Sequence, residues 1–192
     1  MNKTGVIYGI NGPVVYLKGN TGFKMSEMVY VGKERLVGEV IALTKDTTTV
    51  QVFEETTGLK PGETVTASGD ALSVTLGPGI LNNIFDGIER PLSEIAKQSG
   101  KYISRGLTVD SLDTEKKWDV HVTVSEGEEL MGGAIIAETQ ETRSIVHKSM
   151  VPPDVNGTVI WAAKDGKYTI LDPIVKLKLE DGTEKEITLA SI

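Results

Sequence analysis

The sequence contains no cysteine among its 192 residues. Disulfides, thiolate nucleophiles and cysteine-based metal sites are therefore excluded together. Acidic residues outnumber basic ones by 27 to 20, which gives a formal net charge of −7 and a pI near 5.0, so binding of a phosphate backbone would need a strong local exception. Aromatic residues make up only 5% of the composition, which disfavours a site that stacks bases on aromatic rings. We expect no nucleic acid as a partner.

Long hydrophobic runs are missing as well. No apolar segment approaches the roughly 18 residues that cross a bilayer. The first residues are interrupted by Gly9, Asn11, Gly12 and Pro13, which breaks the continuous core of a secretory signal peptide. The hydrophobic fraction of 39% and the charged fraction of 24% are those of a folded, water-soluble chain. A cytoplasmic location fits this composition and the lack of cysteine.

β-Branched residues are abundant, because valine, isoleucine and threonine together account for 56 of the 192 residues. These side chains lose rotamer freedom in helices and pack well on pleated surfaces. The 21 glycines and 7 prolines supply turns between many short strands. The composition therefore predicts a mostly β fold.

Residues 1–70 read as a small β-barrel. Short apolar runs alternate with turn signals such as Gly12-Pro13 and Pro61-Gly62. Closure of the sheet would remove exposed strand edges, so we expect a closed or nearly closed barrel. The expected strands lie around residues 6–10, 14–17, 28–31, 36–43, 48–53 and 63–67.

Residues 71–108 form an expected connector with two short helices. Apolar residues recur at helical spacing from Ile80 to Ile88. Pro91 then occupies a favourable first position for a second helix, and Gly100 is a plausible end for it.

Residues 109–185 return to β character and contain a weak internal repeat. A β-rich run at residues 120–124 leads to Glu126-Gly127, and a second run at residues 159–163 leads to Asp165-Gly166, 39 residues later. The repeat predicts two similar half-sheets packed as a flattened barrel. We expect residues 186–192 to begin a link to a further domain.

The sequence contains few candidates for catalytic residues. Gly-Lys occurs at residues 32–33, 100–101 and 166–167, but no Ser or Thr follows, so the phosphate-binding pattern GxxxxGK[ST] is absent. The two histidines, His121 and His147, are too few for a typical zinc site. Abundant carboxylates flank predicted turns and are expected to be solvated. We therefore expect no catalytic, cofactor-binding or metal-binding residue in this chain.

The repeated β segment resembles the barrel-sandwich shape of biotinyl and lipoyl carrier domains, which present a modifiable lysine at a hairpin tip. Counting along the repeat places that tip near Thr142 or Arg143, or near Val146. None of these is lysine, and Lys148 lies off the tip. The shape is therefore expected to serve as a spacer or docking module.

Three stretches of the chain resemble the N-terminal part of the catalytic A subunit of V/A-type rotary ATPases. They are "GVIYGINGPVVYL" with the following β segments, "ALSVTLGPGILNNIFDGIERPL", and "HKSMVPPDVNGTV" with "GKYTILDPIV". The second is the most specific, because it keeps the family's order and spacing. Glu89 stands where glutamine is commoner. The residues that carry this second stretch, and that we take as structural or interface candidates, are Gly77, Pro78, Gly79, Asp86, Gly87 and Pro91.

This resemblance implies a role in assembly. In the family, the N-terminal barrels form a crown that holds A and B subunits in an alternating hexameric ring. The module at residues 109–185 is the inserted bulge, which contacts the peripheral stalk, and its acidic residues Glu126, Glu128 and Glu129 are candidates for that contact. ATP and Mg²⁺ bind in a later domain with a P-loop. The resemblance thus implies part of an ion-translocating ATPase or ATP synthase, which meets the membrane only indirectly through its ion-translocating sector.

Two other functions remain open from the sequence. One is a free-standing β-barrel interaction module, which a downstream P-loop in the parent gene would exclude. The other is a carrier-like domain, which a biotin-sized or lipoyl-sized adduct in an intact-mass spectrum would support.

Overall fold

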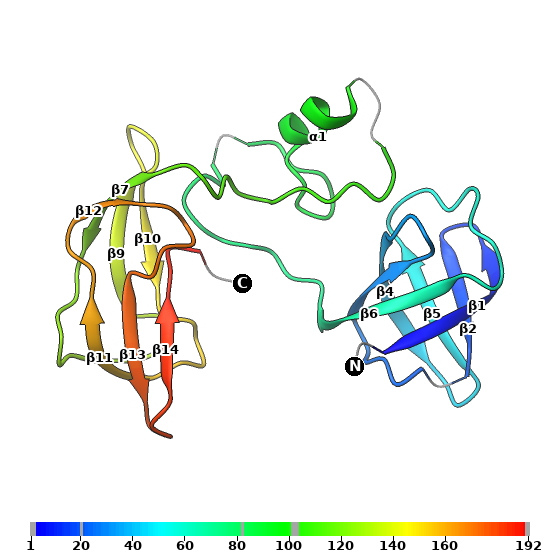
Figure 1. Cartoon of the computed structure of the whole chain (residues 1–192), viewed down its shortest axis with the longest axis horizontal. Coiled ribbons are helices and arrows are strands. Elements are labelled where there is room, and N and C mark those ends of the chain that lie inside the picture. The colour runs from blue at the N-terminus through cyan, green and yellow to red at the C-terminus, as the bar shows by residue number, and fades with distance from the viewer. Residues whose placement is uncertain (1–2, 20, 82, 101–103, 191–192) are drawn as a thin grey trace. The chain divides into compact units, whose positions relative to one another are not determined.

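The computed structural model describes residues 3–19, 21–81, 83–100 and 104–190 (Figure 1). Strands dominate the described residues, as the composition predicts. The chain forms two compact units. Unit 1 contains Met1–Ser73 and Asp86–Val109, and unit 2 contains Val74–Phe85 and Asp110–Ile192. The chain therefore passes from one unit to the other three times.

Unit 1 is built on a closed barrel with strand order β1-β2-β5-β4-β3-β6, in which each strand pairs antiparallel with both neighbours. The barrel predicted from the sequence is confirmed. Alternate residues point inward, so valine, leucine and isoleucine side chains fill the interior. The strands are β1 (Thr4–Asn11), β2 (Val14–Lys18), β3 (Glu27–Val31), β4 (Leu36–Leu43), β5 (Thr47–Val52) and β6 (Thr64–Ala71).

The connector differs from the expectation. Only the second predicted helix forms, as α1 (Leu92–Ser99), with Pro91 in extended conformation just before it and Gly100 at a positive φ of 72° after it. The described residues of 80–88 form turns and irregular backbone instead of a helix. Glycine, asparagine and aspartate in this stretch favour turns over helix, and this local preference overrides the apolar spacing. The connector is also divided, since residues 74–85 belong to unit 2 and residues 86–109 to unit 1.

Unit 2 contains two four-stranded sheets with the orders β10-β9-β7-β12 and β14-β13-β11-β8. The 39-residue repeat appears as two equivalent sets of four strands, and each set lends its short second strand, β8 or β12, to the sheet of the other set. The strands are β7 (Trp118–Val122), β8 (Glu129–Leu130), β9 (Ile135–Gln140), β10 (Val146–Met150), β11 (Gly157–Ala162), β12 (Gly166–Tyr168), β13 (Val175–Leu179) and β14 (Glu184–Ile187).

The end of the chain corrects the expected link at residues 186–192. Glu186 and Ile187 belong to β14, which pairs with β13, and Leu189 is buried in the core of unit 2. The apolar side chains of residues 187 and 189 explain this, because both enter the core. Residues 191 and 192 lie outside the described residues.

Candidate functional site

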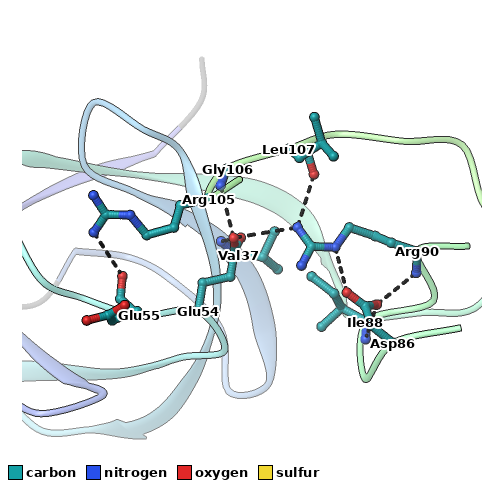
Figure 2. A network of polar contacts seen from close by, with 9 residues as sticks. All are labelled: Val37, Glu54, Glu55, Asp86, Ile88, Arg90, Arg105, Gly106 and Leu107. Carbon is teal, nitrogen blue, oxygen red and sulfur yellow. Dashed lines mark hydrogen bonds and ion pairs between the residues drawn. The ribbon is translucent and has the colours of Figure 1, made fainter. Parts of the chain in front are cut away.

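A buried ion-pair network in unit 1, with Arg90 at its centre, fastens two parts of the second unit 1 segment, residues 86–90 and 105–107, to the barrel (Figure 2). The Arg90 Nε donates to Asp86 Oδ2 at 2.7 Å, and a terminal nitrogen donates to the Leu107 carbonyl at 3.1 Å. The same nitrogen lies 3.5 Å from Glu54 Oε2. The Arg90 side chain is only 10% exposed, and the side chains of Glu54 and Asp86 are 7% and 17% exposed, so this network is largely shielded from water.

Glu54 links the network to the barrel. This residue follows β5, and its side chain is 7% exposed. Its Oε2 accepts the Gly106 N–H at 2.9 Å, and its Oε1 lies 3.5 Å from the Val37 nitrogen on β4. Gly106 has a φ of 66°, and an added Cβ would overlap the Glu34 carbonyl oxygen. The backbone of the segment therefore lies directly against the barrel.

Arg105 adds a second, more exposed attachment. One terminal nitrogen lies 3.2 Å from the Glu34 carboxylate. The other donates to the backbone carbonyls of Glu55 and Thr57. Adjacent residues of the segment, Arg105 and Gly106, thus bind the loop that follows β5.

The electrostatics of Asp86 follow from its donors. Burial raises the pKa of this carboxyl. The backbone N–H groups of Arg90 and Ile88 and the Arg90 guanidinium lower the pKa by more than burial raises it. The net effect holds the pKa of Asp86 below its usual value. Asp86 therefore stays ionised and serves as an anchor for the turn that leads to α1.

A second buried carboxylate organises unit 2. The Glu141 side chain is 2% exposed, and its Oε1 accepts the N–H groups of Gly79 and Leu81 at 2.8 and 2.9 Å. Its Oε2 lies 3.5 Å from His147 Nδ1, and burial lowers the pKa of His147. Glu141 thus fixes the Gly-Pro-Gly stretch to the β9–β10 hairpin.

The predicted glycines have different surroundings. A Cβ on Gly77 would lie 3.0 Å from Leu112 Cδ1 and 3.3 Å from Ala190 Cα, and Gly79 has a φ of 109°. Both glycines therefore allow close packing within unit 2, where Pro78 is buried. Gly87 has open space around its Cα and serves only the turn after Asp86.

The predicted acidic residues gather at the turn between β7 and β8. Glu126, Glu128 and Glu129 are all exposed. Glu128 Oε1 accepts the Ser125 N–H at 2.9 Å and so closes this turn. Among the residues that the structure describes, no Lys, Arg or His lies in ion-pair range of these three carboxylates. Their charge therefore faces solvent.

Two of the three Gly-Lys pairs have surroundings that do not fit a phosphate-binding loop. The N–H of Lys33, which would face a phosphate in a P-loop, donates to Glu63 Oε2 at 3.0 Å. Gly166 and Lys167 are held in β12 by pairing with β7. The pair at residues 100–101 ends outside the described residues. Within the described ranges no group of three His, Asp or Glu could hold a metal, and no helix there is long and apolar enough to span a bilayer.

Comparisons with known proteins match both units. Residues 7–69 match the β-barrel domain of the ATP synthase alpha/beta family, and residues 109–192 match the barrel-sandwich domain of the ATP synthase alpha/beta subunit. The chain is 48% identical over 189 residues to the V-type ATP synthase alpha chain of Halothermothrix orenii, which covers 98% of this chain and 32% of that relative. The chain belongs to the V/A-type ATP synthase A (alpha) chain family.

Two further relatives agree. The A subunit of the A-type ATP synthase of Methanopyrus kandleri is 50% identical over 185 residues, covering 96% of this chain and 31% of the relative. The V-type ATP synthase alpha chain 2 of Clostridium tetani is 49% identical over 185 residues with the same coverage. The chain spans about a third of the length of these relatives and corresponds to the N-terminal region of the family chain.

The structure shows functional contacts that the sequence alone does not indicate. The family motif contains both Asp86 and Arg90, but the sequence does not indicate that Arg90 also pairs with Glu54, 36 positions away, or that Glu141 caps the Gly79 region. No local pattern pairs residues so distant. The hairpin tip at residues 141–145 contains Arg143 and no lysine, while Lys148 lies within β10, as the carrier comparison predicts.

Proposed function

We propose that this chain is the assembly part of the catalytic subunit of an ion-translocating V/A-type ATPase or ATP synthase. The parent couples ATP synthesis or hydrolysis to proton or sodium transport, and binds ATP and Mg²⁺ in a domain outside this chain. The parent complex is cytoplasmic at this end and peripheral to the membrane. The observation that carries the proposal is the 48–50% identity to V/A-type chains along nearly the whole chain, with two family domains in the same order.

The barrel is proposed to join the alternating ring of A and B subunits. Every barrel strand is paired on both sides, so the barrel has no free edge and few soft deformations. A set of such barrels suits a stiff collar that stays assembled while nucleotide sites open and close. The Arg90 network would transmit this rigidity to α1, because it fixes the residues just before α1 on the barrel.

Isothermal titration calorimetry tests the division of labour between this chain and its parent. We expect no ATP binding by residues 1–192, but binding and hydrolysis by the full-length protein once it is assembled with B subunits. The A–B ring should form with this chain present and should fail when residues 1–70 are deleted from the full-length protein. Tight ATP binding by residues 1–192 alone would contradict the proposal.

The bulge is proposed to contact a basic segment of the peripheral stalk through its acidic turn. The variant E126K/E129K reverses two exposed charges and spares Glu128, whose carboxylate closes the turn. In the full-length complex this variant should retain less stalk in a pull-down at low salt, because surface attraction is screened as salt rises. The matched control E115K/D119K, on two exposed carboxylates elsewhere in unit 2, should retain it. Equal retention by both variants removes the stalk contact from the proposal.

A further inference from the structure

Three large apolar side chains lie exposed in unit 2 near the acidic turn. Met131 is 73% exposed, Met150 is 51% exposed and Ile135 is 37% exposed. We call these three residues the methionine patch. Lone exposed apolar residues need no explanation, but a contiguous group of them is a candidate for a contact site.

The backbone pairing brings the three residues together. Met150 at the end of β10 is the register partner of Ile135 at the start of β9. The turn after Met131 returns through an Ala134 N–H bond to the Met131 carbonyl at 3.0 Å. Ala134 then accepts the N–H of Val151 at 2.9 Å, beside Met150. The patch is therefore formed by the β8–β9 turn and the adjoining end of the β9–β10 pair.

The acidic turn lies at the same end of this sheet. Just after β7, the Thr123 N–H donates to the Ile136 carbonyl at 3.0 Å and the Thr123 hydroxyl donates to the Ile135 carbonyl at 3.1 Å. The acidic turn begins just after this point. On β8, Leu130 points into the core, so its neighbours Glu129 and Met131 both point outward. The patch thus has a negative rim made of Glu126, Glu128 and Glu129.

We propose that the methionine patch and its acidic rim form a docking surface for a basic amphipathic helix of a partner protein. Unbranched thioether side chains adapt to the apolar stripe of a helix, and interfaces commonly surround an apolar centre with polar groups. The rim carries no described cation in ion-pair range, so it is complementary to the Lys and Arg that flank such a stripe. A second copy of this chain is a poor occupant, because two acidic rims would repel.

This docking surface extends the proposed stalk contact and rests on that proposal, because the stalk would supply the partner helix. In this surface the apolar patch supplies most of the affinity, while the rim supplies the salt-dependent part. Lys148, the neighbouring cation on β10, lies 3.7 Å from Glu138 and so leaves the rim negative.

Methyl NMR of the 192-residue chain tests the surface directly. The sequence has five methionines, so ¹³C-methyl methionine labelling gives few and separable signals. The probe is a synthetic peptide of about 18 residues with leucine on one helical face and lysine on the other. We expect the Met131 and Met150 signals to shift on titration. The signal of Met25, which is 56% exposed in unit 1, should stay unchanged.

Matched variants give the affinity. M131S/M150S should weaken peptide binding by about tenfold, the loss expected from removing buried apolar contact. M25S removes an exposed methionine outside the patch and should leave the peptide affinity unchanged. E126Q/E129Q should reduce binding at low salt and flatten its salt dependence.

Several results would overturn the inference. In the titration, equal shifts of the Met25 and Met131 signals would do so, and so would equal binding of a peptide with glutamate in place of lysine. Unchanged peptide affinity in M131S/M150S would also do so. Shifts of the Met131 signal that depend on protein concentration without peptide would show that a second copy of the chain occupies the surface. If the peptide binds at the patch while E126K/E129K retains as much stalk as the wild type, the proposed stalk contact is rejected and the proposed docking surface is kept. If the pull-down responds but the peptide does not bind there, the docking surface fails alone.

Discussion

Replacement of Arg90 by methionine removes the only guanidinium that reaches both buried carboxylates of the unit 1 network among the described residues. Methionine keeps much of the side-chain length and apolar stem, so the change isolates the charge and its hydrogen bonds. Asp86 and Glu54 would then remain with 17% and 7% exposed side chains and without their counter-charge.

The expected cost is about 3–5 kcal/mol, the range for removing one partner of a buried ion pair. The bonds that remain limit it: Asp86 keeps the backbone donors of Ile88 and Arg90, and Glu54 keeps that of Gly106. Acid should weaken the wild-type network in a related way. Because the pKa of Asp86 is lowered in the folded state, its contribution is present above the unfolded pKa and is lost as pH falls through the folded value.

Hydrogen exchange with mass spectrometry measures this effect segment by segment. In R90M, amides of α1 and of residues 104–107 should exchange much faster, while the barrel strands keep their protection, because the network holds the segment and not the barrel. Both tryptophans of the chain, Trp118 and Trp161, belong to unit 2. Tryptophan fluorescence during urea unfolding should therefore be unchanged.

The triple variant R90M/E54Q/D86N is the control, because it removes all three charges together. Neutral amides of similar shape no longer need a counter-charge, so protection of α1 should largely return. A loss below about 1 kcal/mol in R90M, or an equal loss in the triple variant, would refute the account of a buried carboxylate pair held by one guanidinium.

The remaining predictions concern unit 2 and one turn of unit 1. Gly79→Ala should destabilise unit 2 by about 1–3 kcal/mol, because φ is 109° and the new Cβ would lie 3.3 Å from the Trp118 ring. Gly87→Ala should be neutral or slightly stabilising, and urea unfolding with hydrogen exchange separates the two outcomes. Proton NMR should find the pKa of His121 above about 6.5, because Asp165 accepts a hydrogen bond from its ring, and that of His147 below it, because of burial. The variant D165N should lower the pKa of His121 alone; the same pKa for both histidines would contradict this geometry.

The sequence predicts the fold well where periodicity and turn chemistry agree. Alternating apolar residues between glycine turns define the barrel strands, and Pro91 and Gly100 bound α1. The helix expected at Ile80–Ile88 does not form, because the apolar residues at helical spacing lie in a segment whose glycine, asparagines and aspartate favour irregular backbone.

The candidate site was less accessible from sequence. Gly79 is marked by its family motif, and the structure gives the reason in its positive φ. Arg90 belongs to the same motif and pairs with Asp86 four residues away, but its second partner, Glu54, lies 36 residues away. Glu54 and Glu141 lie outside the motif, and their ionic side chains look like ordinary surface charge in the sequence. Only the folded structure shows that these charges are buried.

The exchange of β8 and β12 between the two strand sets has a consequence for how unit 2 arises. One half of the repeat on its own would lack the edge strand of its sheet, because β12 and β8 are each supplied by the other half. Each half therefore depends on the other for a complete four-stranded sheet, so we expect neither half to fold alone as well as the two halves fold together. On this view, a circularly permuted unit 2 that begins at β11 should still close both sheets.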